Sequence, residues 1–228
     1  MAEAFLSLSA EDRRDALGVA ADRSGRPAHL LEKDVSVVWA LAKLHGSDYV
    51  APVVMLEFGA RSTGELASLR DVACDASGFV EGVVFPVARP RVMHAERTFW
   101  EKATAIHVFC LQERPRGDRF AHHWHDVVRL DGVGIAAAAI ADRNLALAVA
   151  RHKSIFFAEK AADRNTIDYT VAVTGGLRLV PVGNALKSLE ADYARMVEDG
   201  LLLGDAEPFG ALIAKCADIT IQTNNAAK

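Results

Sequence analysis

Long apolar runs are missing from this 228-residue sequence. Its most apolar-rich stretch, residues 134–150, is interrupted by Asp142, Arg143 and Asn144, whereas a membrane-spanning helix needs about 20 consecutive apolar residues. The N-terminus carries Glu3 and no basic region of the kind that opens a secretory signal. We therefore expect neither a membrane span nor a secretory leader.

Cysteine is scarce as well. The three cysteines, Cys74, Cys110 and Cys216, lie far apart, form no CxxC pair and cannot all be joined in disulfides. This pattern is typical of reduced, buried thiols, so we expect a cytoplasmic protein.

Several common catalytic motifs are also absent, including GxSxG, HExxH and the P-loop. Gly175-Gly176 lacks the GxGxxG context of a dinucleotide-binding turn and therefore indicates a loop. The net charge of −4 argues against a generally basic surface for nucleic acid. A local basic groove stays open beside the alternative of an ordinary solvated face, because seven cations gather within about thirty residues: Arg89, Arg91, Arg97, Lys102, Arg114, Arg116 and Arg119.

Hydrophobic periodicity predicts helices on both sides of a short strand region. The expected strands are 50–58, 69–74 and 80–88. The expected helices are 9–21, 27–45, 95–113, 118–130, 135–162, 183–199 and 207–223. The sequence thus predicts the α+β class, with a small sheet and flanking helices in residues 1–92 and a helical lobe in residues 93–228.

Glu57 is an unusual residue within an otherwise apolar predicted strand, and Gly59 follows it in a predicted turn. A carboxylate at such a strand end could ligate a hard divalent ion such as Mg²⁺. The alternative is a solvent-facing Glu57 paired with Arg61.

Lys102 borders the apolar stripe of the predicted helix 95–113. A lysine in this place either extends to water or points at an anion, which can be a protein carboxylate or a phosphate. Asp126 is the candidate carboxylate, because a short Pro/Gly turn should make helices 95–113 and 118–130 antiparallel neighbours.

The histidines at 122, 123 and 125 offer another kind of site. His122 and Asp126 are four residues apart and share a helix face, so they could form a hydrogen-bonded pair, line a cleft or ligate zinc. A zinc site needs three or four ligands, and further ones are not evident. Similarly, residues 151–153 present either a basic face above Phe156 and Phe157 or a phosphate contact.

Four separated segments, in this order, carry a family resemblance: Leu31–Val35 with Trp39–Leu41, Val54–Ser62, Glu96–Lys102 and His123–Leu130. Together they resemble the AbiEii/AbiGii-type nucleotidyltransferase toxin family in a shortened form. The resemblance implies a nucleotidyltransferase fold with a helical C-terminal part. It also implies a toxin of a toxin–antitoxin system, with an antitoxin partner and, as in some members, tRNA as the acceptor.

The resemblance also implies roles for single residues. Glu57 matches a late-strand carboxylate that binds Mg²⁺, and Lys102 and Asp126 match the helical lysine and aspartate that complete the active site. Lys102 and Arg61 are then the expected contacts to a nucleoside triphosphate. The expected catalytic set is Glu57, Lys102 and Asp126.

The sequence departs from the family where its Gly-Gly-Ser/Thr and Asp-x-Asp motifs belong, because residues 43–53 hold neither. One carboxylate cannot hold the two metal ions that in-line transfer uses, so we expect impaired transferase activity. The alternatives are an inactive remnant that binds nucleotide, RNA or protein, and a metal-binding module at the histidine cluster. A shortened sheet leaves unpaired strand edges in residues 53–87. Such edges can pair with another copy of the chain, so we expect self-association.

Overall fold

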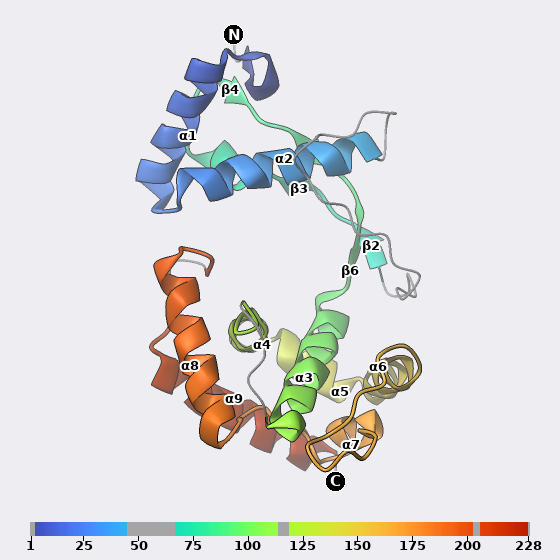
Figure 1. Cartoon of the computed structure of the whole chain (residues 1–228). Coiled ribbons are helices and arrows are strands. Elements are labelled where there is room, and N and C mark those ends of the chain that lie inside the picture. Colours follow the sequence, from blue (N-terminus) through green and yellow to red (C-terminus); the bar gives the residue numbers. More distant parts are fainter. Residues whose placement is uncertain (1–2, 45–66, 114–118, 203–205, 228) are drawn as a thin grey trace. The chain divides into compact units, whose positions relative to one another are not determined.

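The computed structural model describes residues 3–44, 67–113, 119–202 and 206–227. These residues form two compact units, an N-terminal unit within Met1–Met93 and a C-terminal unit within His94–Lys228. Helices dominate both units, and short strands pair in the first (Figure 1), so the predicted α+β class is confirmed. Among the described residues, no helix is long and apolar enough to cross a membrane.

The N-terminal unit is built on α1 (Ala10–Ser24) and α2 (Ala28–Leu44). The side chain of Ser9 accepts a hydrogen bond from the backbone N–H of Asp12 at 3.1 Å, so the helix begins where the capping pattern indicates. Gly25 ends α1 with a φ of 71°, a left-handed conformation that glycine adopts without strain. Leu31, Val35 and Val38 of α2 are buried in the core of this unit.

Strands of this unit form three separate pairs. They are β1 (Glu3–Ala4) parallel to β4 (Val83–Val84), β2 (Ala67–Leu69) antiparallel to β6 (Arg91–Met93), and β3 (Val72–Ala73) antiparallel to β5 (Val87–Ala88). The prediction of one strand over 69–74 was wrong, because Pro90 faces this stretch and has no N–H to continue the ladder. Only the carbonyl of Pro90 bonds there, to the N–H of Arg70 at 3.1 Å.

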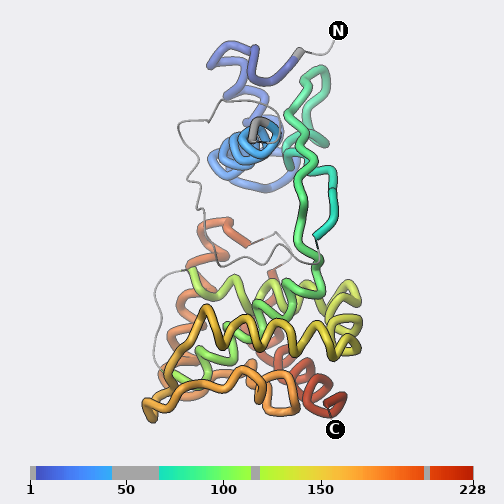
Figure 2. Tube along the Cα trace, turned by 90° about the vertical axis from the view of Figure 1, so that its right-hand side faces the viewer, coloured from blue at the N-terminus to red at the C-terminus, as the bar shows by residue number. Residues whose placement is uncertain are grey.

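The C-terminal unit consists of helices around α3 (Figures 1 and 2). Its helices are α3 (Ala95–Gln112), α4 (His122–Gly132), α5 (Ile135–Ala141), α6 (Arg143–Phe156), α7 (Tyr169–Val173), α8 (Gly183–Glu198) and α9 (Phe209–Ala226). Two tryptophans in the core have no exposed surface, and both indole N–H groups are bonded. Trp100 donates to the carbonyl of Ala139 at 2.9 Å, and Trp124 donates to that of Leu179 at 2.7 Å.

The prediction of one helix over 135–162 was wrong. Asp142 interrupts it, because its side chain accepts the backbone N–H of Leu145 at 3.0 Å and so starts a new helix, α6. The segment between α6 and α8 also contains a short helix, α7, which is capped in the same way by Asp168.

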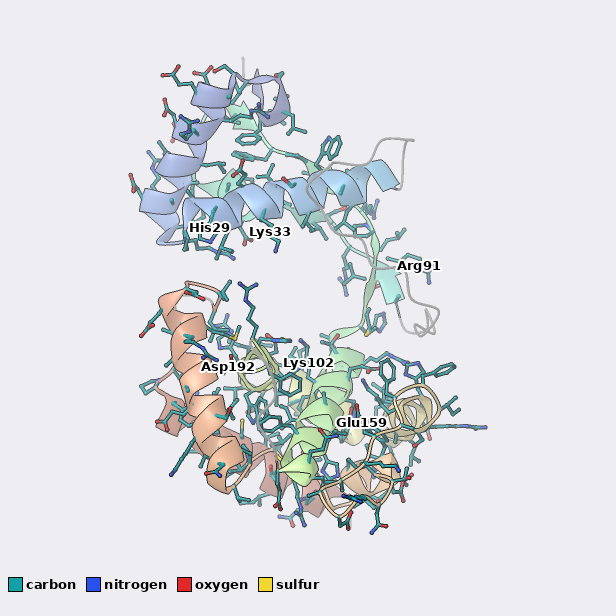
Figure 3. All side chains as sticks on the ribbon, viewed as in Figure 1. His29, Lys33, Arg91, Lys102, Glu159 and Asp192 are labelled. Carbon is teal, nitrogen blue, oxygen red and sulfur yellow. The ribbon has the colours of Figure 1, made fainter. Side chains whose placement is uncertain are left out.

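The first turn of α4 is held by Asp192, a buried residue of α8 (Figure 3). Its two carboxylate oxygens accept the backbone N–H groups of Arg119 and Ala121, each at 2.8 Å. A carboxylate is favoured at a helix N-terminus because the first N–H groups there have no partner within the helix. Asp192 therefore fixes the start of the helix that carries Asp126.

Candidate functional site

Lys102 and Asp126 are in contact. The Nζ of Lys102 on α3 lies 2.7 Å from Oδ2 of Asp126 on α4, and these two helices pack against each other (Figure 3). The Lys102 side chain is 22% exposed and that of Asp126 is 38% exposed, so the pair is accessible to a ligand. The structure therefore brings together two of the three residues in the expected catalytic set. Glu57 and Arg61 lie outside the described residues.

A second ionic group lies beside this pair, centred on Glu101 of α3. Its carboxylate is 2.5 Å from Nζ of Lys153 and 3.4 Å from Nη2 of Arg97. The ring of His152 is also close, with Nδ1 3.7 Å from the same carboxylate. Arg97 is only 3% exposed, and Lys153 also lies over the ring of Phe157. This Glu101 cluster joins α3 to α6.

Sequence reasoning missed the Glu101 cluster. Part of the cluster could have been predicted, because Arg97 and Glu101 are four residues apart on a helix, and this spacing favours ion pairs. The contact with Lys153 spans two helices and has no such signature. The predicted basic face above the aromatic rings is present in part, since Lys153 lies over the ring of Phe157, and His152 and Lys153 also face the carboxylate of Glu101.

Positive charge exceeds negative charge across these two groups. Arg97, Lys102 and Lys153 face the carboxylates of Glu101 and Asp126. In addition, Nε of Arg97 is buried and has no hydrogen-bond partner in the part of the chain that the structure describes. Arg97 lies five positions from Lys102 on α3, so it belongs to the Glu101 cluster on the α6 side and does not face the Lys102–Asp126 pair.

The histidines of α4 do not form the predicted pair with Asp126. His122 contacts the carbonyl of Arg119 instead, because it occupies the first position of α4 and lies one turn from that carbonyl. His125 is buried, and desolvation lowers its pKa while the charge of Asp126 opposes the shift. Among the described residues, no group of three His, Cys, Asp or Glu side chains could hold a metal ion.

Mg²⁺ requires several oxygen ligands in octahedral geometry. Beside Lys102 the described residues offer the carboxylate of Asp126, one oxygen of which already bonds the lysine ammonium. The carboxylate of Glu101 is enclosed by cations. These donors do not fit a pair of Mg²⁺ ions.

The same chain was compared with known proteins. The family model described as "Nucleotidyl transferase AbiEii toxin, Type IV TA system" matches residues 1–215. The chain belongs to this family. Searches of curated proteins and of solved structures each found no match. Membership in the AbiEii family confirms the resemblance seen in the four sequence segments. It makes the protein a toxin-like nucleotidyltransferase and implies an antitoxin partner, since type IV systems pair a toxin with an antitoxin.

Proposed function

We propose that this AbiEii-family protein binds the triphosphate of a nucleotide through Lys102 but transfers the nucleotide poorly. The observation that supports the binding step most is the 2.7 Å contact between Lys102 Nζ and Asp126 Oδ2. The carboxylate holds the ammonium at an accessible place between α3 and α4. Phosphate oxygens can approach the remaining N–H donors of this ammonium.

The expected weakness of transfer has a chemical reason. In-line nucleotidyl transfer relies on metal ions that neutralise the triphosphate and activate the attacking oxygen. The sequence lacks the Gly-Gly-Ser/Thr and Asp-x-Asp motifs, and the described donors near Lys102 do not fit two Mg²⁺ ions. In this proposal Glu57 supplies a single metal-binding carboxylate, and Arg61 supplies a second contact to the nucleotide.

A protein that binds nucleotide or RNA without any transfer is the second candidate. It is supported by the partly exposed ammonium of Lys102, which needs no metal ligand to attract phosphate. Incorporation of nucleotide into an acceptor separates the two candidates, because only the first performs it. A tRNA acceptor, and self-association through residues 53–87, remain predictions from the sequence.

Replacing Lys102 by methionine tests the binding step. We expect the Kd of ATP, or of whichever of the four ribonucleoside triphosphates binds most tightly, to rise about tenfold or more, because a charge-assisted contact to phosphate is lost. Isothermal titration calorimetry with the full chain measures this change. Lys187→Met is a matched control, since Lys187 is exposed on α8. Equal Kd values for the wild type and Lys102→Met would contradict the proposed site.

A further inference from the structure

A cavity lies within the C-terminal unit, at the C-terminal half of α3. It has a volume of about 470 Å³ and is lined by residues of α3, of the segment 161–168 and of the segment 176–178. Its polar and charged lining includes His107, Asp163, Asp168 and Arg178, and its apolar lining includes Leu111, Ile167 and Leu177. Side chains five positions apart on an α-helix point in directions about 140° apart, so His107 does not share the face of Lys102. The cavity is therefore distinct from the nucleotide site.

His107 places a hydrogen-bond donor at this cavity. The residue is 2% exposed, and its Nδ1 accepts the backbone N–H of Arg178 at 3.1 Å. Because Nδ1 is the acceptor, the proton of the neutral ring is on Nε2. Burial, followed by the charge of Arg178, lowers the pKa of His107 to about 4, so the ring is neutral near pH 7. Within the described part of the chain, Nε2 has no hydrogen-bond partner.

Arg178 adds a cation to the same cavity. Its backbone N–H is used by His107, whereas its guanidinium has no hydrogen-bond or ion-pair partner among the described residues. Arg178 is an exposed residue that lines the cavity together with His107. A buried neutral donor and an unpaired guanidinium at one cavity together suit an oxyanion, which accepts hydrogen bonds from both.

The segment that carries Arg178 is held in place. Asn224 of α9 bonds both backbone groups of Leu177, accepting from its N–H at 2.8 Å and donating to its carbonyl at 3.1 Å. Gly176 lies so close to Val171 that an added Cβ would be 2.5 Å from a methyl carbon of that valine. Gly176 is thus explained by close packing against α7 and Gly175 by its φ of 105°, and the backbone that orients His107 through the N–H of Arg178 is preorganised.

The other residues that line the cavity indicate what the ligand carries besides its oxyanion. Leu111, Ile167 and Leu177 provide an apolar surface. Asp168 uses one oxygen to cap α7 through the N–H of Thr170, so its other oxygen can accept a hydrogen bond from a ligand. The ligand that matches these groups has an oxyanion, a small apolar part and a nearby O–H or N–H donor.

We propose that this cavity binds a small molecule through its carboxylate or phosphate group, with the guanidinium of Arg178 and the Nε2–H of His107 as the donors. Amino acids and nucleoside monophosphates both combine an oxyanion with a nearby donor. This second site is independent of Lys102, so neither nucleotide transfer nor nucleotide binding at Lys102 is needed for it.

The test is a titration of the ¹⁵N-labelled full chain, followed through the imidazole signals of His107 in long-range ¹H–¹⁵N NMR spectra. His107→Asn assigns these signals. The phosphate probes are inorganic phosphate and AMP, and the carboxylate probes are acetate and L-leucine, each up to about 20 mM so that a millimolar Kd is detected. We expect at least one probe to shift the Nε2–H signal. The probe type that binds identifies the source of the oxyanion.

Two variants make the test specific. Arg178→Gln is expected to raise the Kd of the binding probe about tenfold or more, because a charged donor is lost. Arg151→Gln removes the same charge at an exposed position of α6 outside the cavity, and should leave Kd within about twofold of the wild type. The Lys102→Met variant should also bind the probe normally. Unchanged His107 signals with all four probes, or equal losses in Arg178→Gln and Arg151→Gln, would overturn the proposal.

Discussion

Replacing Glu101 by alanine is expected to lower the free energy of unfolding by about 3–5 kcal/mol, the usual effect of removing one partner from a buried ion pair. The reason is the environment of the cations that Glu101 neutralises. Arg97 is 3% exposed and Lys153 is 12% exposed, so neither can turn fully to water when the carboxylate is removed. The chain would then hold uncompensated positive charge between α3 and α6.

Urea unfolding followed by circular dichroism measures this effect. Glu190→Ala is the matched control, because Glu190 is exposed in the middle of α8, and it should change the free energy of unfolding by no more than about 0.5 kcal/mol. If Glu101→Ala has as little effect as the control, the Glu101 cluster does not join the two helices in the way described.

The second large effect is a loss of stability in acid that arises from His107. Burial lowers the pKa of His107 from 6.5 to about 4 in the folded chain. As the pH falls from 6.5 to 4, the unfolded chain therefore binds a proton that the folded chain does not. The contribution of His107 to stability is complete above pH 6.5 and decreases through this window, by about 3 kcal/mol in total.

Comparison with His107→Asn isolates this contribution, because carboxylates also titrate in the same window. Asparagine can still accept the N–H of Arg178 through its side-chain oxygen, but it has no proton to take up. Unfolding free energies at pH 7, 6, 5 and 4 should fall more steeply for the wild type than for the variant. Parallel pH profiles of the two proteins would show that His107 titrates normally and is not enclosed as described.

Features that depend on local spacing could be predicted from the sequence. The apolar periodicity of residues 95–113 located α3 to within a residue at each end, and the Pro/Gly turn after it indicated that the next helix, which carries Asp126, is a neighbour of α3, although α4 crosses α3 and is not antiparallel to it (Figure 1). The Lys102–Asp126 contact follows from these two facts. The family, too, could be recognised, because its segments are local and keep their order.

Features that depend on distant contacts could not be predicted. The bond between His107 and the backbone of Arg178 joins residues 71 positions apart, and the contact of Glu101 with Lys153 joins two helices. A side-chain cap also ended a helix that apolar periodicity alone would continue. The apolar residues of 135–162 keep helical spacing throughout, but Asp142 caps α6 and so divides the stretch into two helices. His122 and Asp126 have the spacing of a pair, but the start of α4 at His122 directs the ring to the carbonyl of Arg119.

Nucleotide transfer by the purified full chain tests the central claim most directly. Radiolabelled nucleoside triphosphates, Mg²⁺ and total tRNA are incubated with the wild type, with Lys102→Ala and with Glu57→Ala, and label in the RNA is counted. We predict that the wild type adds label slowly, just above the reaction without protein, and that Lys102→Ala removes this trace because the triphosphate binds through Lys102. Many turnovers by the wild type that either substitution abolishes would contradict the impaired site and would show a working nucleotidyltransferase.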